Sequence, residues 1–234
     1  MFQYKKYFDE YCEENKLSLS LSYTMPCGYE TAYGTFDLNL QTIFINKNLL
    51  KDKEEFEQAF YLFHELRHAV KYINPQSFND IINGSLSYII MYDGTCYKRV
   101  GDKYYKYKID GDEEFLKNLY LSQPYEMDAN EYAYKKVSEV MGFSKELEQL
   151  YHNWMPKDII PYENFRLIYK EMIWIEKTKV DLNVLAWFFN IKLTINVKGK
   201  KEILSRVSFL IVRSSKLNYS HSLYRIHYFL TDIK

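Results

Sequence analysis

The segment KDKEEFEQAFYLFHELRHAVKYI, residues 51–73, carries the strongest helix pattern in the chain. Acidic residues crowd its first turns, where they complement the helix dipole. Its apolar side chains recur at helical spacing and form one stripe, made of Phe56, Ala59, Phe60, Phe63, Leu66, Val70 and Ile73. Pro75 follows the end of the pattern. The segment is therefore predicted to be an amphipathic helix that buries one face.

The other segments alternate between helix and strand patterns. Helices are expected at residues 2–16, 112–121, 122–142, 144–153 and 162–177, and strands at 17–23 and, as a hairpin or two short strands, 35–48. Residues 85–111 read as a three-stranded meander with turns at Asp93-Gly94 and Gly101-Asp102. In the helix at 122–142, Ser122 is the expected N-cap, and Gly142 lies past its end.

These patterns predict an α+β fold. Residues 1–180 are expected to form one domain, with the meander at 85–110 inserted into it. Residues 181–234 are expected to form a basic C-terminal extension, with a short helix and then a hairpin. This extension either packs on the same domain or forms an appendage.

Charge and cysteine content indicate which partners and which compartment suit the protein. The 31 Lys/Arg balance the 31 Asp/Glu, but residues 191–234 carry nine basic and two acidic residues, a net of +7. A solvated surface is the favoured interpretation, because the stretch is also apolar and has the pattern of a folded segment. The alternative is contact with nucleic acid or an acidic partner. Three scattered cysteines without CxxC spacing favour a reducing compartment. No secretory signal or membrane span is visible, so a soluble, cytoplasmic protein is expected.

The stretch FHELRHAVKY, residues 63–72, holds the residues with the clearest chemistry. His64 and His68 are four apart, so on a helix they share one face and can take two corners of a tetrahedral Zn²⁺. Glu65 lies about 100° round the helix, where it can act as general base on a metal-bound water. The alternative is a solvated helix face. Three facts favour a site: the pair borders the apolar stripe, it uses two of only five histidines, and a third ligand is available.

The candidate third ligand is Glu126, in the first turn of the helix at 122–142. A hydrolytic zinc site needs three protein ligands and one open position, and His64, His68 and Glu126 supply three. The alternative for Glu126 is simple stabilisation of a helix N-terminus. Asn130 lies one turn further on the same face, where it can support a ligand as an outer hydrogen-bonding partner.

HELRH followed by EMDANEYA resembles the zinc metallopeptidases of the gluzincin kind, and most of all the phage- and mobile-element-associated group that includes the ImmA/IrrE proteins. The resemblance covers roughly residues 32–142. It implies a zincin-like core, made of a small antiparallel or mixed sheet, an active-site helix and a second ligand-bearing helix. It implies His64, His68 and Glu126 as ligands of one Zn²⁺, Glu65 as general base, and Asp128 as the second acid of the motif. The upstream segment AYGTFDLNLQTIFIN resembles the strand pair whose edge holds an extended substrate peptide.

The expected function is therefore zinc-dependent hydrolysis of a peptide bond in a protein or peptide substrate. Arg67, His152 and several tyrosines are candidates for oxyanion or substrate contacts. The meander is either a flap over the cleft or a surface decoration. The alternative function is a non-catalytic zinc-containing regulatory or binding protein of a phage or mobile element, whose basic C-terminal section contacts nucleic acid or a protein partner. The oligomeric state stays open.

Overall fold

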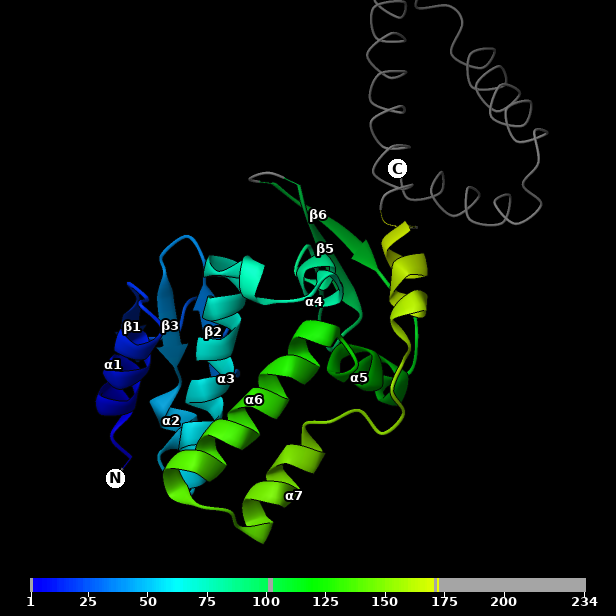
Figure 1. Ribbon diagram of the computed structural model, residues 1–234. Coiled ribbons are helices and arrows are strands. Elements are labelled where there is room, and N and C mark those ends of the chain that lie inside the picture. The colour runs from blue at the N-terminus through cyan, green and yellow to red at the C-terminus, as the bar shows by residue number, and fades with distance from the viewer. Residues whose placement is uncertain (1, 101–102, 171, 173–234) are drawn as a thin grey trace, which may run out of the picture. The chain divides into compact units, whose positions relative to one another are not determined.

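The computed structural model describes residues 2–100, 103–170 and 172 (Figure 1). Over these residues the protein is a mixed α+β fold with two small sheets, so the predicted fold class is confirmed at that level. The predicted extension at 181–234 and the predicted turn at Gly101-Asp102 lie outside the described residues. In the described part of the chain, none of the helices combines the length and apolarity needed to cross a membrane.

The first sheet is mixed and lies in the N-terminal third of the chain. Helix α1 (Tyr4–Glu14) precedes strands β1 (Ser20–Ser22), β2 (Gly34–Asp37) and β3 (Thr42–Ile45). Their spatial order is β1-β3-β2, with β1 parallel and β2 antiparallel to β3. Strand β3 is central, and all four of its residues are buried. Strand β2 is therefore an edge strand.

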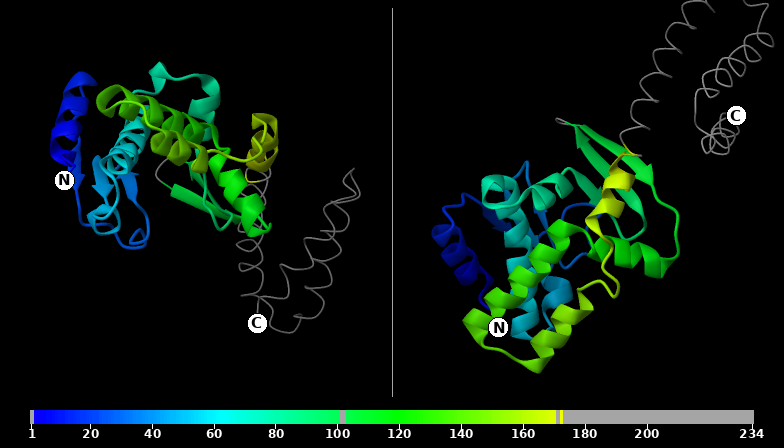
Figure 2. Two further views of the ribbon diagram at one scale, coloured as in Figure 1. Left: turned by 90° about the horizontal axis from the view of Figure 1, so that it is seen from below. Right: turned by 45° about the vertical axis from the view of Figure 1, so that its right-hand side comes forward.

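Helix α3 (Glu55–Ile73) follows the short helix α2 (Lys47–Leu50) and lies between the first sheet and helix α6 (Pro124–Met141) (Figures 1 and 2). It starts with a capping box. The side chain of Glu54 accepts the backbone N–H of Glu57, and the side chain of Glu57 accepts the backbone N–H of Glu54. Because elements cover it on several sides, its burial extends beyond the predicted stripe. The buried residues include Tyr61, Leu62, His68, Ala69 and Lys71.

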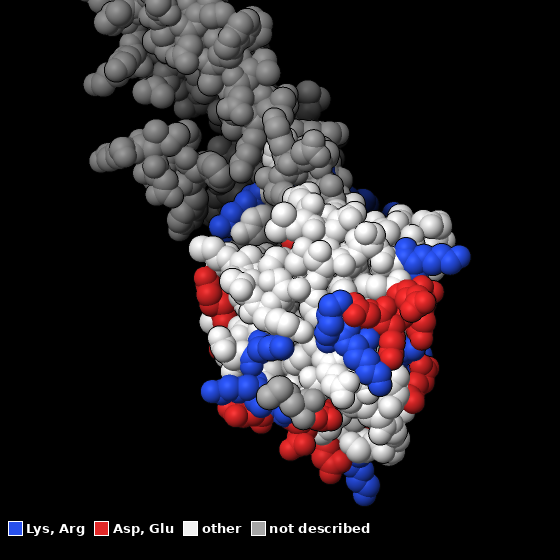
Figure 3. Space-filling model, turned by 90° about the vertical axis from the view of Figure 1, so that its left-hand side faces the viewer, with Lys and Arg blue, Asp and Glu red and all other residues white. Residues whose placement is uncertain are grey.

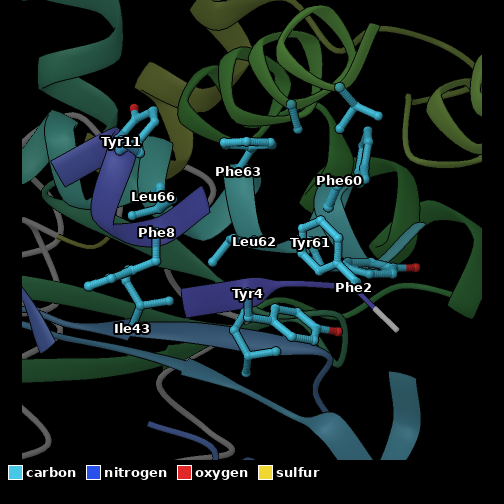
Figure 4. Close-up of a cluster of buried hydrophobic side chains, with 14 of the residues drawn as sticks. Phe2, Tyr4, Phe8, Tyr11, Ile43, Phe60, Tyr61, Leu62, Phe63 and Leu66 are labelled. Atoms are coloured by element: carbon cyan, nitrogen blue, oxygen red, sulfur yellow. The ribbon is translucent and has the colours of Figure 1, made fainter. Parts of the chain in front are cut away.

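The main hydrophobic core forms where α1, α3 and the sheet meet (Figure 4). Phe8, Ile43, Leu62, Phe63 and Leu66 are at most 3% exposed in it. At about 25 cal/mol per Å² of apolar area, burying one such side chain contributes roughly 1.5–3 kcal/mol. This core fixes the face that α3 turns toward α6.

The predicted meander is confirmed as a second sheet, formed by β4 (Tyr88–Ile90), β5 (Thr95–Val100) and β6 (Lys103–Lys108), all antiparallel in the order β4-β5-β6. Gly94 adopts a φ of +78° in its first turn, which explains the Asp93-Gly94 signal. The sheet has its own small core, which includes Ile90, Cys96 and Leu119. A 3₁₀ helix (Pro75–Ser77) and helix α4 (Asp80–Ser85), which the sequence patterns did not predict, connect α3 to this sheet.

Helices α5 (Glu113–Leu121), α6 and α7 (Lys145–Asn153) follow close to the predicted positions, and residues 162–170 are helical as well. The predicted N-cap of α6 is wrong. Ser122 ends α5, because its N–H closes the last turn on the Asn118 carbonyl at 2.9 Å, and Gln123 takes the N-cap position before Pro124. Gly142 ends α6 with a φ of +88°, as predicted.

Candidate metal centre

His64 and His68 occupy one face of α3, four residues apart, on the side that meets α6. Their Nε2 atoms lie 3.0 Å from each other. The two side chains are only 12% and 10% exposed. Two imidazole nitrogens held this close away from water need a shared proton or a cation between them.

Glu126 completes a group of three potential ligands. It lies in the first turn of α6, directly after Pro124 and Tyr125, and is 5% exposed. Its Oε2 atom is 3.3 Å from Nε2 of His64 and 3.6 Å from Nε2 of His68. The same buried oxygen has no hydrogen-bond partner among the described residues. These three residues form a group that could hold a metal ion.

The spacing of the three atoms fits a small cation. With Zn–N and Zn–O bonds of roughly 2.0–2.1 Å, the ligand atoms of a tetrahedral site lie about 3.3 Å apart. The observed separations are 3.0, 3.3 and 3.6 Å. The partnerless carboxylate oxygen points to the same conclusion, because a cation would satisfy it together with both imidazoles.

The protonation states suit a cation as well. Burial alone would raise the pKa of Glu126, but His68 and His64 hold that pKa well below its usual range, so the carboxyl is ionised. Burial lowers the pKa of His68 to about 4, so this ring is neutral near pH 7. Burial opposes protonation of His64 too, yet the adjoining Glu126 carboxylate raises its pKa. A metal ion would compete with the proton on His64.

Glu65 stands beside the three ligand candidates without joining their group. Burial raises its pKa to about 7, with the charge of His64 acting against the rise and that of Glu126 adding to it. A carboxyl with this pKa can accept a proton and release it again near neutral pH. Its side chain lies against Gly34 of β2: a Cβ on Gly34 would be 2.7 Å from Cγ of Glu65.

The outer edge of β2 lies beside the Glu65 carboxylate and carries backbone N–H and C=O groups that pair with no other described strand. The N–H of Asn46 donates to the carbonyl of Tyr33 at 2.9 Å, which makes this a hydrogen-bonded pair of the antiparallel ladder. Such pairs alternate, so Thr35 opposite Phe44 is the next one. The N–H and C=O groups of Gly34 and Phe36 therefore point away from β3. In the part of the chain that the structure describes, no further strand pairs with this edge.

Arg67 and Asp128 pair with each other instead of facing the ligand group. Nε and Nη2 of Arg67 donate to the two oxygens of Asp128 at 2.8 and 2.9 Å. The guanidinium also lies between the rings of Phe78 and Tyr132, 4.5 Å from each centroid. The oxyanion role considered for Arg67 finds no support in these contacts. Asp128 therefore links α6 to α3.

Asn130 and His152 make their described contacts with other groups. Nδ2 of the buried Asn130 donates to the carbonyl of Trp154 at 2.8 Å, and this bond fastens the end of α7 to α6. The predicted role of Asn130 as an outer hydrogen-bonding partner of a ligand stays a prediction. His152 is exposed in the last turn of α7, with its ring beside Tyr151. No described contact joins His152 to the ligand group.

Two further features escaped the sequence analysis. Lys71 is fully buried beside Asp128, and its position one turn after His68 on a helix was the available signal. Tyr92 and Tyr120 stack at 3.9 Å between ring centroids. Burial raises the pKa of Tyr120, and the negative charges of Glu126 and Glu65 add to this effect. The tyrosines were named only as a class, because their distances depend on the fold.

The meander is joined to the first turn of α6 through Gln123. This fully buried side chain accepts from the N–H of Ile90 at 2.9 Å and donates to its carbonyl at 3.0 Å. Tyr92, two residues after the end of β4, stacks on Tyr120 of α5. The meander therefore borders the candidate site.

Comparisons with protein-family models, with curated proteins and with solved structures give no match for this chain.

Proposed function

We propose that this protein is a zinc-dependent metallopeptidase with a zincin-like core. The observation that carries the proposal is the triangle of His64 Nε2, His68 Nε2 and Glu126 Oε2, with separations of 3.0–3.6 Å, beside a carboxyl whose pKa is raised to about 7. Three ligands leave a fourth corner of a tetrahedral site for water or substrate. A structural zinc site would close that corner, and the described residues offer no fourth member of the group.

His64, His68 and Glu126 would hold the ion, and zinc, when bound, supplies Lewis acidity that activates water and polarises a carbonyl. Glu65 takes a proton from the attacking water as the water oxygen bonds to the carbonyl carbon. It then delivers a proton to the amide nitrogen as the C–N bond breaks, which yields a carboxyl and an amine. The hydroxyl of Tyr120 is the candidate donor to the developing oxyanion.

An extended peptide is the substrate shape that suits this site. The outward N–H and C=O groups of Gly34 and Phe36 can pair with a peptide added as a further strand. Glu65 contacts Gly34, so a peptide on this edge would pass beside the proposed base. On the face in Figure 3, basic and acidic side chains lie next to one another.

The decisive experiment compares wild type and Glu65→Gln in a cleavage assay on host lysate, read by mass spectrometry of new peptide ends. The variant removes the base and keeps the three ligands, so we expect cleavage to fall by roughly 10²–10⁴-fold. Its zinc content should stay at about one ion per chain. Glu131→Gln on the exposed face of α6 is the matched control and should cleave like wild type.

Identical products from wild type and Glu65→Gln would contradict the peptidase proposal. Zinc retained by a wild-type protein that cleaves nothing would favour the non-catalytic alternative. Wild type purified from zinc-replete cells without bound zinc would contradict both.

A further inference from the structure

Lys71 is the most unusual charged residue in the described part of the chain. Its side chain is 0% exposed, although lysine is almost never fully buried without a partner. Removing an ammonium group from water costs several kcal/mol in a real protein. The proposed catalytic steps do not use Lys71. Its burial therefore needs another explanation, and its contacts supply one.

Nζ of Lys71 contacts α6 on both sides of Glu126. It donates to the backbone carbonyl of Tyr125, the residue before Glu126. It also lies 3.1 Å from Oδ2 of Asp128, two residues after Glu126. One ammonium group thus binds α6 one residue before and two residues after the candidate ligand. The link is direct, because no other side chain intervenes.

Arg67 adds a second connection between the same two helices. It lies one turn before Lys71 on α3 and binds Asp128 through two hydrogen bonds. Two cations four residues apart on a helix would repel each other, and the shared carboxylate offsets this repulsion. α3 therefore supplies both histidine ligands and both cations, while α6 supplies Glu126 and Asp128. The same helix pair forms the metal group and the ion cluster.

We propose that Lys71 is a positioning residue that, with Arg67 and Asp128, sets the location of Glu126 for metal binding. The inference rests on the metal site of the proposed function. Metal ligands must be held within about 0.5 Å of their productive geometry by neighbours that are themselves fixed. Glu126 lies in the first turn of α6, which fewer backbone hydrogen bonds hold than the helix interior. The Lys71 contacts restrain that turn on each side of the ligand.

The test is a Co²⁺ titration of apo-protein, followed by its visible absorption and by competition with Zn²⁺. Lys71→Met keeps the length of the side chain and removes the ammonium. We expect metal affinity to fall about 10–100-fold, the usual effect of losing a partner that orients a ligand. Circular dichroism first establishes a temperature at which each apo-variant is folded, so that loss of fold does not count as loss of affinity. Lys135→Met, at an exposed ion pair on α6, is the matched control and should bind as wild type.

A double-mutant cycle tests the route through Asp128. Asp128→Asn should also weaken metal binding. Lys71→Met should reduce the metal affinity of the Asp128→Asn variant by a smaller factor than it reduces the affinity of the wild type. If Lys71→Met does not fold without metal, Asp128→Asn alone carries the test. Wild-type affinity in the folded variant tested would overturn the positioning role while leaving the metal site standing. A wild-type protein that binds neither ion would overturn the metal site and this inference with it.

Discussion

At the scale of single residues, Gly34 decides how closely Glu65 approaches the edge of β2. A Cβ at this position would lie 2.7 Å from Cγ and 3.2 Å from Oε1 of Glu65, and 3.2 Å from the carbonyl of Phe44. The backbone oxygen cannot move without disturbing β3, so the glutamate must give way. The absence of a side chain at Gly34 therefore sets the position of the proposed base.

We expect Gly34→Ala to reduce cleavage by about one to two orders of magnitude, because small displacements of a catalytic group are costly. Metal affinity should stay unchanged, since none of the three ligands contacts Gly34 in the described interactions. Turnover and a Zn²⁺ titration of the same preparation check both parts. Gly84→Ala, whose added Cβ would meet only the Tyr162 side chain, is the control and should retain turnover. Full turnover in Gly34→Ala would show that Glu65 tolerates the shift.

At the scale of elements, α3 combines two tasks that its sequence pattern shows only in part. The apolar stripe was predictable because large side chains recur at helical spacing. The pattern does not show that Gln58, His68 and Lys71 are buried too, on the sides that meet other elements. These residues are buried with partners: Gln58 donates to the Lys53 carbonyl just before the helix, whereas His68 and Lys71 meet acidic residues of α6. Burial of the site face is thus a property of the helix pair.

Helix α7 should depend measurably on its N-cap. Oγ of Ser144 accepts the N–H of Leu147 at 3.1 Å, and Leu147 and Leu150 pack into the main core. Ser144→Ala should lower the free energy of unfolding by about 1 kcal/mol, because an N–H of the first turn loses its acceptor. Urea unfolding followed by circular dichroism measures this change.

Ser138→Ala is the matched control for the cap. Oγ of Ser138 donates to the carbonyl of Tyr134 within α6, a bond that adds little in a helix interior. Alanine also has the higher helix propensity, so stability should be equal or slightly greater. Equal losses in both variants would show that the cap hydrogen bond is not the cause.

At the scale of the whole molecule, buried thiols and phenols make the fold sensitive to alkali. Burial raises the pKa of Cys96 to about 12 and that of Cys12 to about 11. Burial likewise raises the pKa values of Tyr11, Tyr61 and Tyr169 above their usual 10. In the unfolded chain these groups ionise near pH 8.5 and 10. Above about pH 8.5 the unfolded state therefore binds fewer protons than the folded state, and stability falls as pH rises.

We expect the midpoint of thermal unfolding to decrease steadily from pH 8.5 to 10.5, with the increase in tyrosinate absorbance coinciding with unfolding. Lys71 acts in the opposite direction, because burial lowers its pKa to about 8, but it is one group against several. Thermal scans at half-unit pH steps, recorded at 222 and 295 nm, make the comparison. A midpoint that is constant up to pH 10.5 would contradict the burial of these groups.

The sequence by itself determined the features that depend on local geometry. Residues four apart on a helix share a face, so HELRH fixed the relation of His64, Glu65 and His68 before any fold was known. The hairpin turn at Asp93-Gly94 and the C-cap at Gly142 followed from the backbone freedom of glycine. The resemblance to a metallopeptidase motif also singled out Glu126 without showing where it would lie.

Only the tertiary structure decided which distant residues meet. It brought Oε2 of Glu126 to within 3.3–3.6 Å of the histidines and paired Asp128 with Arg67 and Lys71. It also set the open edge of β2 beside Glu65. These contacts join segments far apart in the chain, so they depend on how helices and strands pack around a common core. Spacing along the sequence carries no information about that packing.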